Sequence, residues 1–186
     1  GFKTIGVIRG DELGFNLKKV LEENDTLRKA NENGMEFCFV SRQDYRNKET
    51  ESFIDYLKNK FGDFYLIPEG GTNDLAIKGC SEILSEKDKN FNYICVSVGT
   101  GGTISGLIKS VINTEQQIIG FPALKEGFLL NEIKKTTINQ KNWCLQKDYH
   151  FGGYAKYNKE LIIFINEFKK NTSILLDPIY TGKMLF

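Results

Sequence analysis

Short β-prone runs alternate with helix-periodic segments along this chain. Strands are predicted over residues 4–8, 36–40, 64–67, 93–98, 117–121 and 173–176. Between them, apolar residues recur at helical spacing and predict helices over 26–33, 49–61, 74–85, 104–111 and 161–168. Such alternation favours parallel strands joined by right-handed helical crossovers. The predicted fold class is therefore α/β, an architecture in which ligands bind at the carboxyl ends of the strands.

Charge and composition limit what the chain can bind. Its 25 Lys and Arg against 24 Asp and Glu leave a net charge of +1, with no basic stripe. The sequence therefore predicts no nucleic acid and no membrane partner, and it favours a small molecule. The four cysteines show no CxxC or Cys/His spacing, so reduced thiols and no metal site are predicted. Reduced thiols, together with the lack of a secretory apolar segment, predict a cytoplasmic location.

The ends of the sequence indicate a piece of a longer protein. Gly1 stands directly before a strand-like run without an initiator Met, and Phe186 falls where a helix is expected to open. A domain boundary is predicted after Gly62, because a helix ends there and the glycine-rich loops all lie beyond it. The two expected parts are residues 1–62 and 63–186.

The segment VGTGGTISGL places a glycine-rich turn between a strand and a helix. The strand ends at Val98, three glycines and two threonines follow within Gly99–Thr103, and an apolar-periodic helix begins. Such a turn can hold a phosphate, because glycines let the backbone approach, unpaired N–H groups donate and the helix dipole favours an anion. Ile104 stands where a dinucleotide fingerprint needs glycine or alanine, and the turn lacks the Gly-Lys-Ser/Thr of a P-loop. The alternative is a tight strand-to-helix turn that binds nothing.

A second glycine loop follows the predicted strand 64–67. Glu69, Gly70 and Gly71 form this candidate cleft loop, and Thr72 and Asn73 are candidates for capping the next helix. By itself, such a loop is more often an ordinary capped turn than a binding site.

A third loop, in LLDPIYTGKML, follows the last predicted strand. It offers a phenol at Tyr180, a hydroxyl at Thr181 and an amine at Lys183. Taken alone, Tyr180 would be a half-buried packing residue and Thr181 the cap of the following helix. Because the carboxyl ends of parallel strands meet at one edge of a sheet, the three loops are expected to converge on one cleft.

Two further candidate residues lie between the glycine turn and the loop that carries Tyr180. His150 is the sole histidine, and neither a glycine-flanked nucleophile nor a second metal ligand accompanies it. It is interpreted as a structural or surface residue. Tyr154 follows two glycines in FGGYAKY, either in a flexible loop that reaches the cleft or in a plain aromatic loop.

Read together, these segments resemble one enzyme family. IRGDE, VSRQDYRNK, IPEGGTND, VGTGGTISGL, FGGYAK and LDPIYTGKM look like the 1-aminocyclopropane-1-carboxylate deaminase and D-cysteine desulfhydrase family, in the family's order and over nearly the whole chain. The resemblance implies the tryptophan-synthase-β-like, fold-type-II parallel-sheet sandwich, truncated at both ends. Residues 1–62 would be the remainder of its small domain and 63–186 an incomplete, large cofactor-binding domain. It also implies pyridoxal 5'-phosphate as cofactor, a small amino-acid substrate and a homodimer of the complete protein.

The resemblance carries roles to particular residues. The cofactor phosphate is expected on the backbone of one run, Gly99, Thr100, Gly101, Gly102 and Thr103. Tyr180 resembles the family's catalytic tyrosine beside the cofactor ring, Tyr154 a second tyrosine of the substrate pocket, and Thr181 the contact to the pyridine nitrogen. A bulky side chain at Gly101 is expected to occupy the space that the phosphate needs.

The departures from the family pattern matter as much. These 186 residues contain neither a GNKxRKL-like stretch, which supplies the family's Schiff-base lysine, nor a YSNH-like stretch. Lys183 is no substitute, because its counterpart in the family follows the pyridine contact and no glycine-asparagine motif precedes it. The chain alone is therefore predicted to be inactive, and the complete protein to be a pyridoxal-phosphate-dependent lyase or deaminase.

Two further questions stay open from the sequence. Thr181 in place of a glutamate favours D-cysteine over 1-aminocyclopropane-1-carboxylate as substrate, because a hydroxyl leaves the ring nearer neutral than a carboxylate does. The alternative function is a non-catalytic phosphate- or nucleotide-binding module.

Overall fold

The computed structural model describes residues 2–112, 115–125 and 127–186. The chain divides into two compact units, the first ending at Leu66 and the second beginning at Ile67. This division falls a few residues beyond Gly62, where a boundary was predicted from the sequence. The assignment of the two parts to a small and a large enzyme domain stays a prediction.

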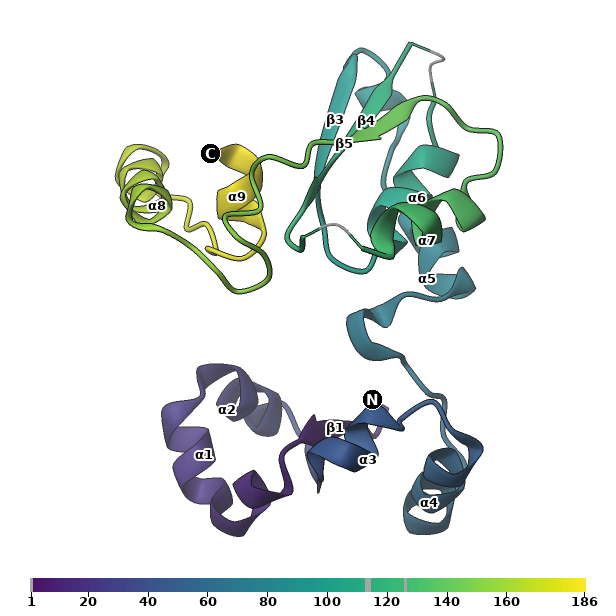
Figure 1. Ribbon diagram of the computed structural model, residues 1–186, viewed down its shortest axis with the longest axis vertical. Helices are drawn as coiled ribbons and strands as arrows, with labels where there is room; N and C mark the ends of the chain where they lie inside the picture. Colours follow the sequence, from purple (N-terminus) through teal and green to yellow (C-terminus); the bar gives the residue numbers. More distant parts are fainter. Residues whose placement is uncertain (1, 113–114, 126) are drawn as a thin grey trace. The chain divides into compact units, whose positions relative to one another are not determined.

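The first unit is built on two parallel strands. β1 (Ile5–Arg9) pairs with β2 (Glu36–Val40), and the crossover between them contains α1 (Leu17–Glu23) and α2 (Asp25–Glu32). Beyond β2 come α3 (Arg42–Arg46) and α4 (Glu51–Phe61), as Figure 1 shows. The buried core joins the sheet to α4 through Cys38, Val40, Phe53 and Leu57.

Glycines end α2 and α4 of this unit where the sequence placed them. Gly34 follows α2 with φ +85, and its N–H donates to the carbonyl of Asn31 at 2.9 Å. Gly62 follows α4 with φ +78. Both angles lie where L side chains are strained, so glycine is the residue that these helix ends accept at least cost.

The second unit holds a three-stranded parallel sheet in the order β3-β4-β5. Its strands are β3 (Tyr93–Val98), β4 (Gln117–Pro122) and β5 (Trp143–Leu145). The helices are α5 (Asp74–Cys80), α6 (Gly102–Lys109), α7 (Leu129–Thr136), α8 (Lys159–Thr172) and α9 (Thr181–Leu185). In Figure 1, α6 and α7 lie together beside the sheet, whereas α8 and α9 lie apart from them.

The main core of this unit lies between the sheet and α6 and α7. Its buried side chains are Val98, Ile104, Leu107, Ile108, Ile118, Leu129 and Ile133. A smaller cluster around Leu161, Ile165 and Leu176 joins α8 to the segment before α9. The predicted α/β class with parallel strands is confirmed.

Two predicted strands are wrong. Residues 64–67 and 173–176 form no strand and pair with none in the described part of the chain. Ile67 and Leu175 are 69% and 70% exposed, so their β-branched or apolar character does not bury them in a sheet. The tendency to form a strand depends on a neighbouring strand and a face to pack against, which local sequence does not report.

Other elements were missed or misjudged in length. α1, α3, α7 and β5 were not predicted, and the helix expected to reach residue 85 ends at Cys80. Within the described residues, no helix is both long enough and apolar enough to cross a membrane.

The close packing of α5 against α6 makes a prediction about Gly106. A Cβ on this residue would meet the Cβ of Cys80 and lie 2.7 Å from the backbone of both Cys80 and Ile77. We expect Gly106→Ala to lower the free energy of unfolding by about 2 kcal/mol or more, because helix backbone must move apart.

Gly79 on α5 is the matched control, since a Cβ there meets nothing within 4 Å. Gly79→Ala should be neutral, or stabilise by up to about 1 kcal/mol through the reduced entropy of the unfolded chain. Urea unfolding of both variants of the complete protein measures the difference. Equal midpoints for the two would contradict the packing described.

Candidate phosphate-binding active site

Three loops of the second unit line one pocket of about 410 Å³. The loop before α5 contributes Gly70, Gly71 and Thr72, the turn after β3 contributes Gly99–Thr103, and the segment before α9 contributes Tyr180. Ala76, Cys80, Ser97, Val98 and Ile104 complete the lining. The pocket therefore lies at the carboxyl end of β3, where the topology of a parallel α/β sheet predicts ligand binding.

The turn after β3 adopts its shape through Gly101. This residue precedes α6 with φ +94 and ψ −3, a left-handed conformation. α6 begins at Gly102, and the first N–H groups of any helix have no carbonyl partner within that helix. Glycines at positions 99, 101 and 102 line the pocket with backbone in place of side chains. The turn thus combines N–H donors with the positive end of a helix dipole.

The sequence-based reason for needing glycine at position 101 is wrong. A Cβ on Gly101 would point at Ile133 and Leu129, 3.2 and 3.3 Å away, which belong to the hydrophobic core. It would not occupy the pocket. Glycine is required here by its positive φ and by the close approach of α7.

The loop before α5 contacts the glycine turn through hydroxyl groups. Thr72 Oγ1 and Thr100 Oγ1 lie 2.5 Å apart in a hydrogen bond, and Thr100 Oγ1 also lies 3.5 Å from the Gly70 carbonyl oxygen that accepts from it. A Cβ on Gly102 would lie 2.7 Å from Thr72 Oγ1. The two loops therefore pack with no room for a larger residue at Gly70 or at Gly102.

Thr72 and Asn73, the two residues of this loop predicted as helix caps, turn out to do different things. Asn73 caps α5, since its side-chain oxygen accepts from the N–H of Ala76 at 2.8 Å. Thr72 instead lines the pocket, where the sequence offered it only as a cap. Its position directly after two glycines was the available signal. Glu69 is exposed and lies outside the pocket lining.

Tyr180 lies over the glycine turn. A Cβ on Gly99 would be 3.3 Å from both Cε1 and the phenol oxygen of Tyr180, so only glycine leaves space for the ring. The ring of Tyr154 packs edge-on against Tyr180, with centroids 6.3 Å apart. Burial raises the pKa of Tyr180, and the neighbouring Tyr154 raises it further. The phenol of Tyr180 therefore keeps its proton at neutral pH.

Tyr154 itself stands at the edge of this arrangement. Its side chain is 54% exposed and is not part of the pocket lining. The structure thus brings the two predicted tyrosines together. Tyr180 lines the pocket, and Tyr154 packs against Tyr180 from outside the lining.

Thr181 is engaged with Asp177 and does not line the pocket. Its hydroxyl donates to Asp177 Oδ2 at 2.6 Å and accepts from the N–H of Asp177 at 2.9 Å. The Asp177 carboxylate also accepts from the N–H groups of Ile179, Tyr180 and Thr181. Burial opposes ionisation of Asp177, but these hydrogen bonds outweigh it and lower the pKa of that carboxyl. The contact of Thr181 with a pyridine nitrogen stays a prediction.

The expectation that Lys183 offers its amine to the cleft is wrong. Lys183 is 2% exposed, and its Nζ donates to main-chain carbonyls of His150 and Gly153, both at 2.9 Å. It is not part of the pocket lining. His150 was interpreted as a structural or a surface residue. The structure supports the structural interpretation, since its Nδ1 accepts from the N–H of Gly152 at 2.8 Å.

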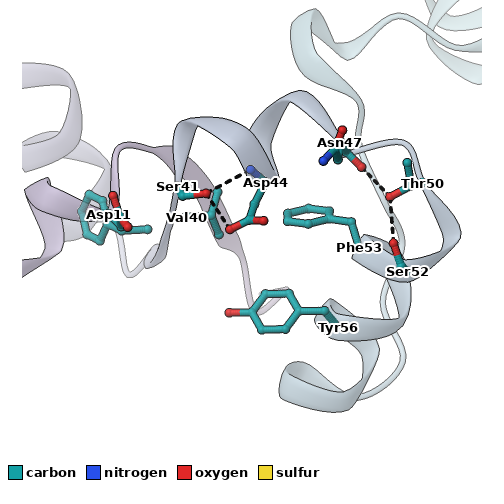
Figure 2. Close-up of a pocket in the computed structure, with 10 residues that line it drawn as sticks. Asp11, Val40, Ser41, Asp44, Asn47, Thr50, Ser52, Phe53 and Tyr56 are labelled. Carbon is teal, nitrogen blue, oxygen red and sulfur yellow. Dashed lines mark hydrogen bonds between the residues drawn. The ribbon is translucent and has the colours of Figure 1, made fainter.

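A second pocket, of about 450 Å³, lies in the first unit (Figure 2). The Ser41 hydroxyl donates to Asp44 Oδ2 and accepts from the Asp44 N–H, which caps α3. The Thr50 hydroxyl donates to the carbonyl of Asn47. Several polar groups of this pocket thus serve to cap and connect α3 and α4, and none of the predicted site residues lies in it.

The pocket at the glycine turn fits a phosphate-bearing group by its chemistry. Among the described residues that line it, none is acidic, while backbone N–H groups and the hydroxyls of Thr72, Thr100 and Thr103 are concentrated there. A tyrosine stands next to this donor set. The arrangement can therefore hold an anion and place a phenol beside whatever the anion carries.

Comparison with known proteins points to one group. No family model matches the chain. A Pyrococcus furiosus protein, provisionally named 1-aminocyclopropane-1-carboxylate deaminase, is 28% identical over 94% of this chain and 61% of its own length. The Arabidopsis thaliana mitochondrial bifunctional D-cysteine desulfhydrase/1-aminocyclopropane-1-carboxylate deaminase is 26% identical over 82% of this chain and 44% of its own.

A solved structure agrees with these relatives. The crystal structure of an ACC deaminase homologue matches all of this chain and 59% of its own, with a TM-score of 0.68 and 26% identity. The chain is a homologue of these deaminases and desulfhydrases. It spans about half to three fifths of the length of the curated relatives it matches first. The recognition made from PEGG, the glycine turn and DPxYTGK is confirmed, and so is the fold that it implied.

Proposed function

We propose that the complete protein is a pyridoxal-phosphate-dependent enzyme that removes ammonia from a small amino acid. One pocket carries this proposal. Its lining has no acidic residue, and it brings together the glycine turn, the Thr72–Thr100 hydroxyl pair and the Tyr180 phenol. Relatives named as deaminases and desulfhydrases support it.

Each part of the pocket would have its own task. Gly99–Thr103 would hold the cofactor phosphate with backbone N–H groups at the start of α6, and Thr72 and Thr100 would add hydroxyl donors. When bound, the cofactor supplies an electron sink for charge that develops at the substrate α-carbon. Tyr180, whose raised pKa keeps the phenol protonated, would donate or return a proton at its oxygen.

The substrate preference rests on one side chain. Thr181 stands where a carboxylate is expected of cyclopropane-opening deaminases, and its own hydroxyl proton is already directed at Asp177. A hydroxyl carries no formal negative charge that would hold a proton on a ring nitrogen beside it. We therefore propose D-cysteine as substrate ahead of 1-aminocyclopropane-1-carboxylate; with one water, D-cysteine gives pyruvate, ammonia and sulfide.

The test uses the complete protein loaded with pyridoxal 5'-phosphate. We expect visible absorbance from lysine-bound cofactor, its loss on borohydride reduction, and a higher kcat/KM for D-cysteine than for 1-aminocyclopropane-1-carboxylate. The 186-residue chain alone should show no turnover. A complete protein that never takes up the cofactor would refute the proposal in favour of a non-catalytic module, and a preference for the cyclopropane substrate would refute only the role given to Thr181.

A further inference from the structure

Lys183 is a buried cation that the proposed chemistry does not use. It lies in α9, is 2% exposed, and donates to three main-chain oxygens: those of His150 at 2.9 Å, Gly153 at 2.9 Å and Ala123 at 3.4 Å. No carboxylate is among these partners. A lysine is almost never fully buried unless its charge is compensated, so this arrangement calls for a specific role.

The number of partners matches the charged form of the amine. An ammonium group has three N–H donors and no acceptor, and three carbonyl oxygens face it. A neutral amine would leave one carbonyl without its donor. Burial lowers the pKa of Lys183, but Asp177 opposes this effect. The geometry therefore describes an ammonium that organises backbone.

Two of the three carbonyls belong to the loop that bears Tyr154, the tyrosine whose ring packs against Tyr180. Ala123 directly follows β4, and His150 and Gly153 lie in the loop between β5 and α8. Gly153 has φ +119 and is followed at once by Tyr154. Lys183 is one helical turn beyond Tyr180. A single amine thus ties the loop that bears Tyr154 to the helix start that bears Tyr180.

We propose that Lys183 is a positioning residue that holds Tyr154 against Tyr180 and so fixes the Tyr180 phenol in the pocket. The edge-on contact of the two rings, 6.3 Å between centroids, depends on both segments being held in place. The part of this inference that concerns turnover rests on the proposed function. The part that concerns the tyrosine pair does not.

Lys183→Met in the complete protein tests the pair directly, since methionine keeps most of the length and loses the donors. Lys170→Met, at an exposed position of α8, is the matched control for charge and side-chain change. The readout is NMR of ring-labelled tyrosines, assigned with Tyr154→Phe and Tyr180→Phe. We expect Lys183→Met to abolish the ring–ring contact and to move the pKa of Tyr180 back toward 10.0, and Lys170→Met to change neither. Retention of both signals in a folded Lys183→Met variant would overturn the proposal.

Kinetics separate positioning from simple loss of structure. A displacement of ~1 Å at a reacting group costs on the order of 10²-fold in rate, so we expect a kcat loss of that order with KM and phosphate affinity changed far less. Lys183→Arg, which keeps donors for the carbonyls, should recover part of kcat. Equal losses in Lys183→Arg and Lys183→Met would overturn the role of the donors.

Two further outcomes are informative. If Lys183→Met does not fold, Lys183→Ala with added propylammonium takes its place: recovery of the ring contact with the amine but not with propanol supports the proposal, and recovery with neither overturns it. If the wild-type protein turns over neither substrate, the proposed function fails, and the NMR comparison still decides the role of Lys183.

Discussion

Tyr180→Phe in the complete, cofactor-loaded protein is expected to lower kcat on the order of 10²–10⁴-fold, the usual contribution of a positioned proton donor. The ring that packs over Gly99 would remain, so the pocket should keep its shape. KM and cofactor affinity should therefore change little. Steady-state kinetics with D-cysteine and with 1-aminocyclopropane-1-carboxylate measures the changes in kcat and KM separately.

The pH profile gives a second measure of the same residue. Because burial and Tyr154 raise the pKa of Tyr180 above 10.0, the phenol holds its proton through neutrality and loses it only at higher pH. Activity that depends on this proton should fall on the alkaline side, and that fall should be absent in Tyr180→Phe. The control is Tyr157→Phe, at a tyrosine 60% exposed outside the pocket lining. Equal rates for both variants would refute a catalytic Tyr180.

Gly70→Ala should weaken phosphate binding strongly. Gly70 has φ +76, and a Cβ there would lie 2.5 Å from Cγ2 and 2.9 Å from Oγ1 of Thr100. Thr100 would have to turn away, which would break its hydrogen bond to Thr72. Hydrogen bonds to charged groups are worth about 1.5–3 kcal/mol each, so the loss of one or two predicts a decrease in affinity on the order of 10²-fold. Calorimetric titration with inorganic phosphate and with pyridoxal 5'-phosphate measures it.

Gly71→Ala separates this clash from backbone strain. Gly71 has φ +70, nearly the same as Gly70, but a Cβ there meets nothing within 4 Å. Both variants therefore pay for a strained alanine, and only Gly70→Ala disturbs Thr100. Equal losses of affinity in the two variants would mean that strain alone matters, and that the Thr72–Thr100 pair has no part in holding the anion.

The local elements that the sequence predicted well are those with strong local signals. The strand 36–40 follows from an apolar run, and the turn before α6 follows from glycines at 99, 101 and 102, whose conformational freedom is a property of the residue itself. Gly34 and Gly62 end their helices for the same reason. The three loops line one pocket, as predicted, but the reason given for their meeting holds only for the glycine turn, because the other two loops follow residues 64–67 and 173–176, which form no strand in the described chain.

Only the tertiary structure decided which side chains of those loops face the pocket. Residues 64–67 and 173–176 carry β-prone side chains but pair with no strand in the described chain, since pairing depends on neighbours distant in sequence. Thr72 entered the pocket, Thr181 turned to Asp177 and the amine of Lys183 turned to the carbonyls of His150 and Gly153. The sequence by itself determined the α/β class, the glycine turn and the resemblance to deaminases and desulfhydrases, because these depend on residue type and order. The direction of each polar side chain depended on partners up to 60 residues away, such as Ala123 for Lys183, and so was settled only by packing.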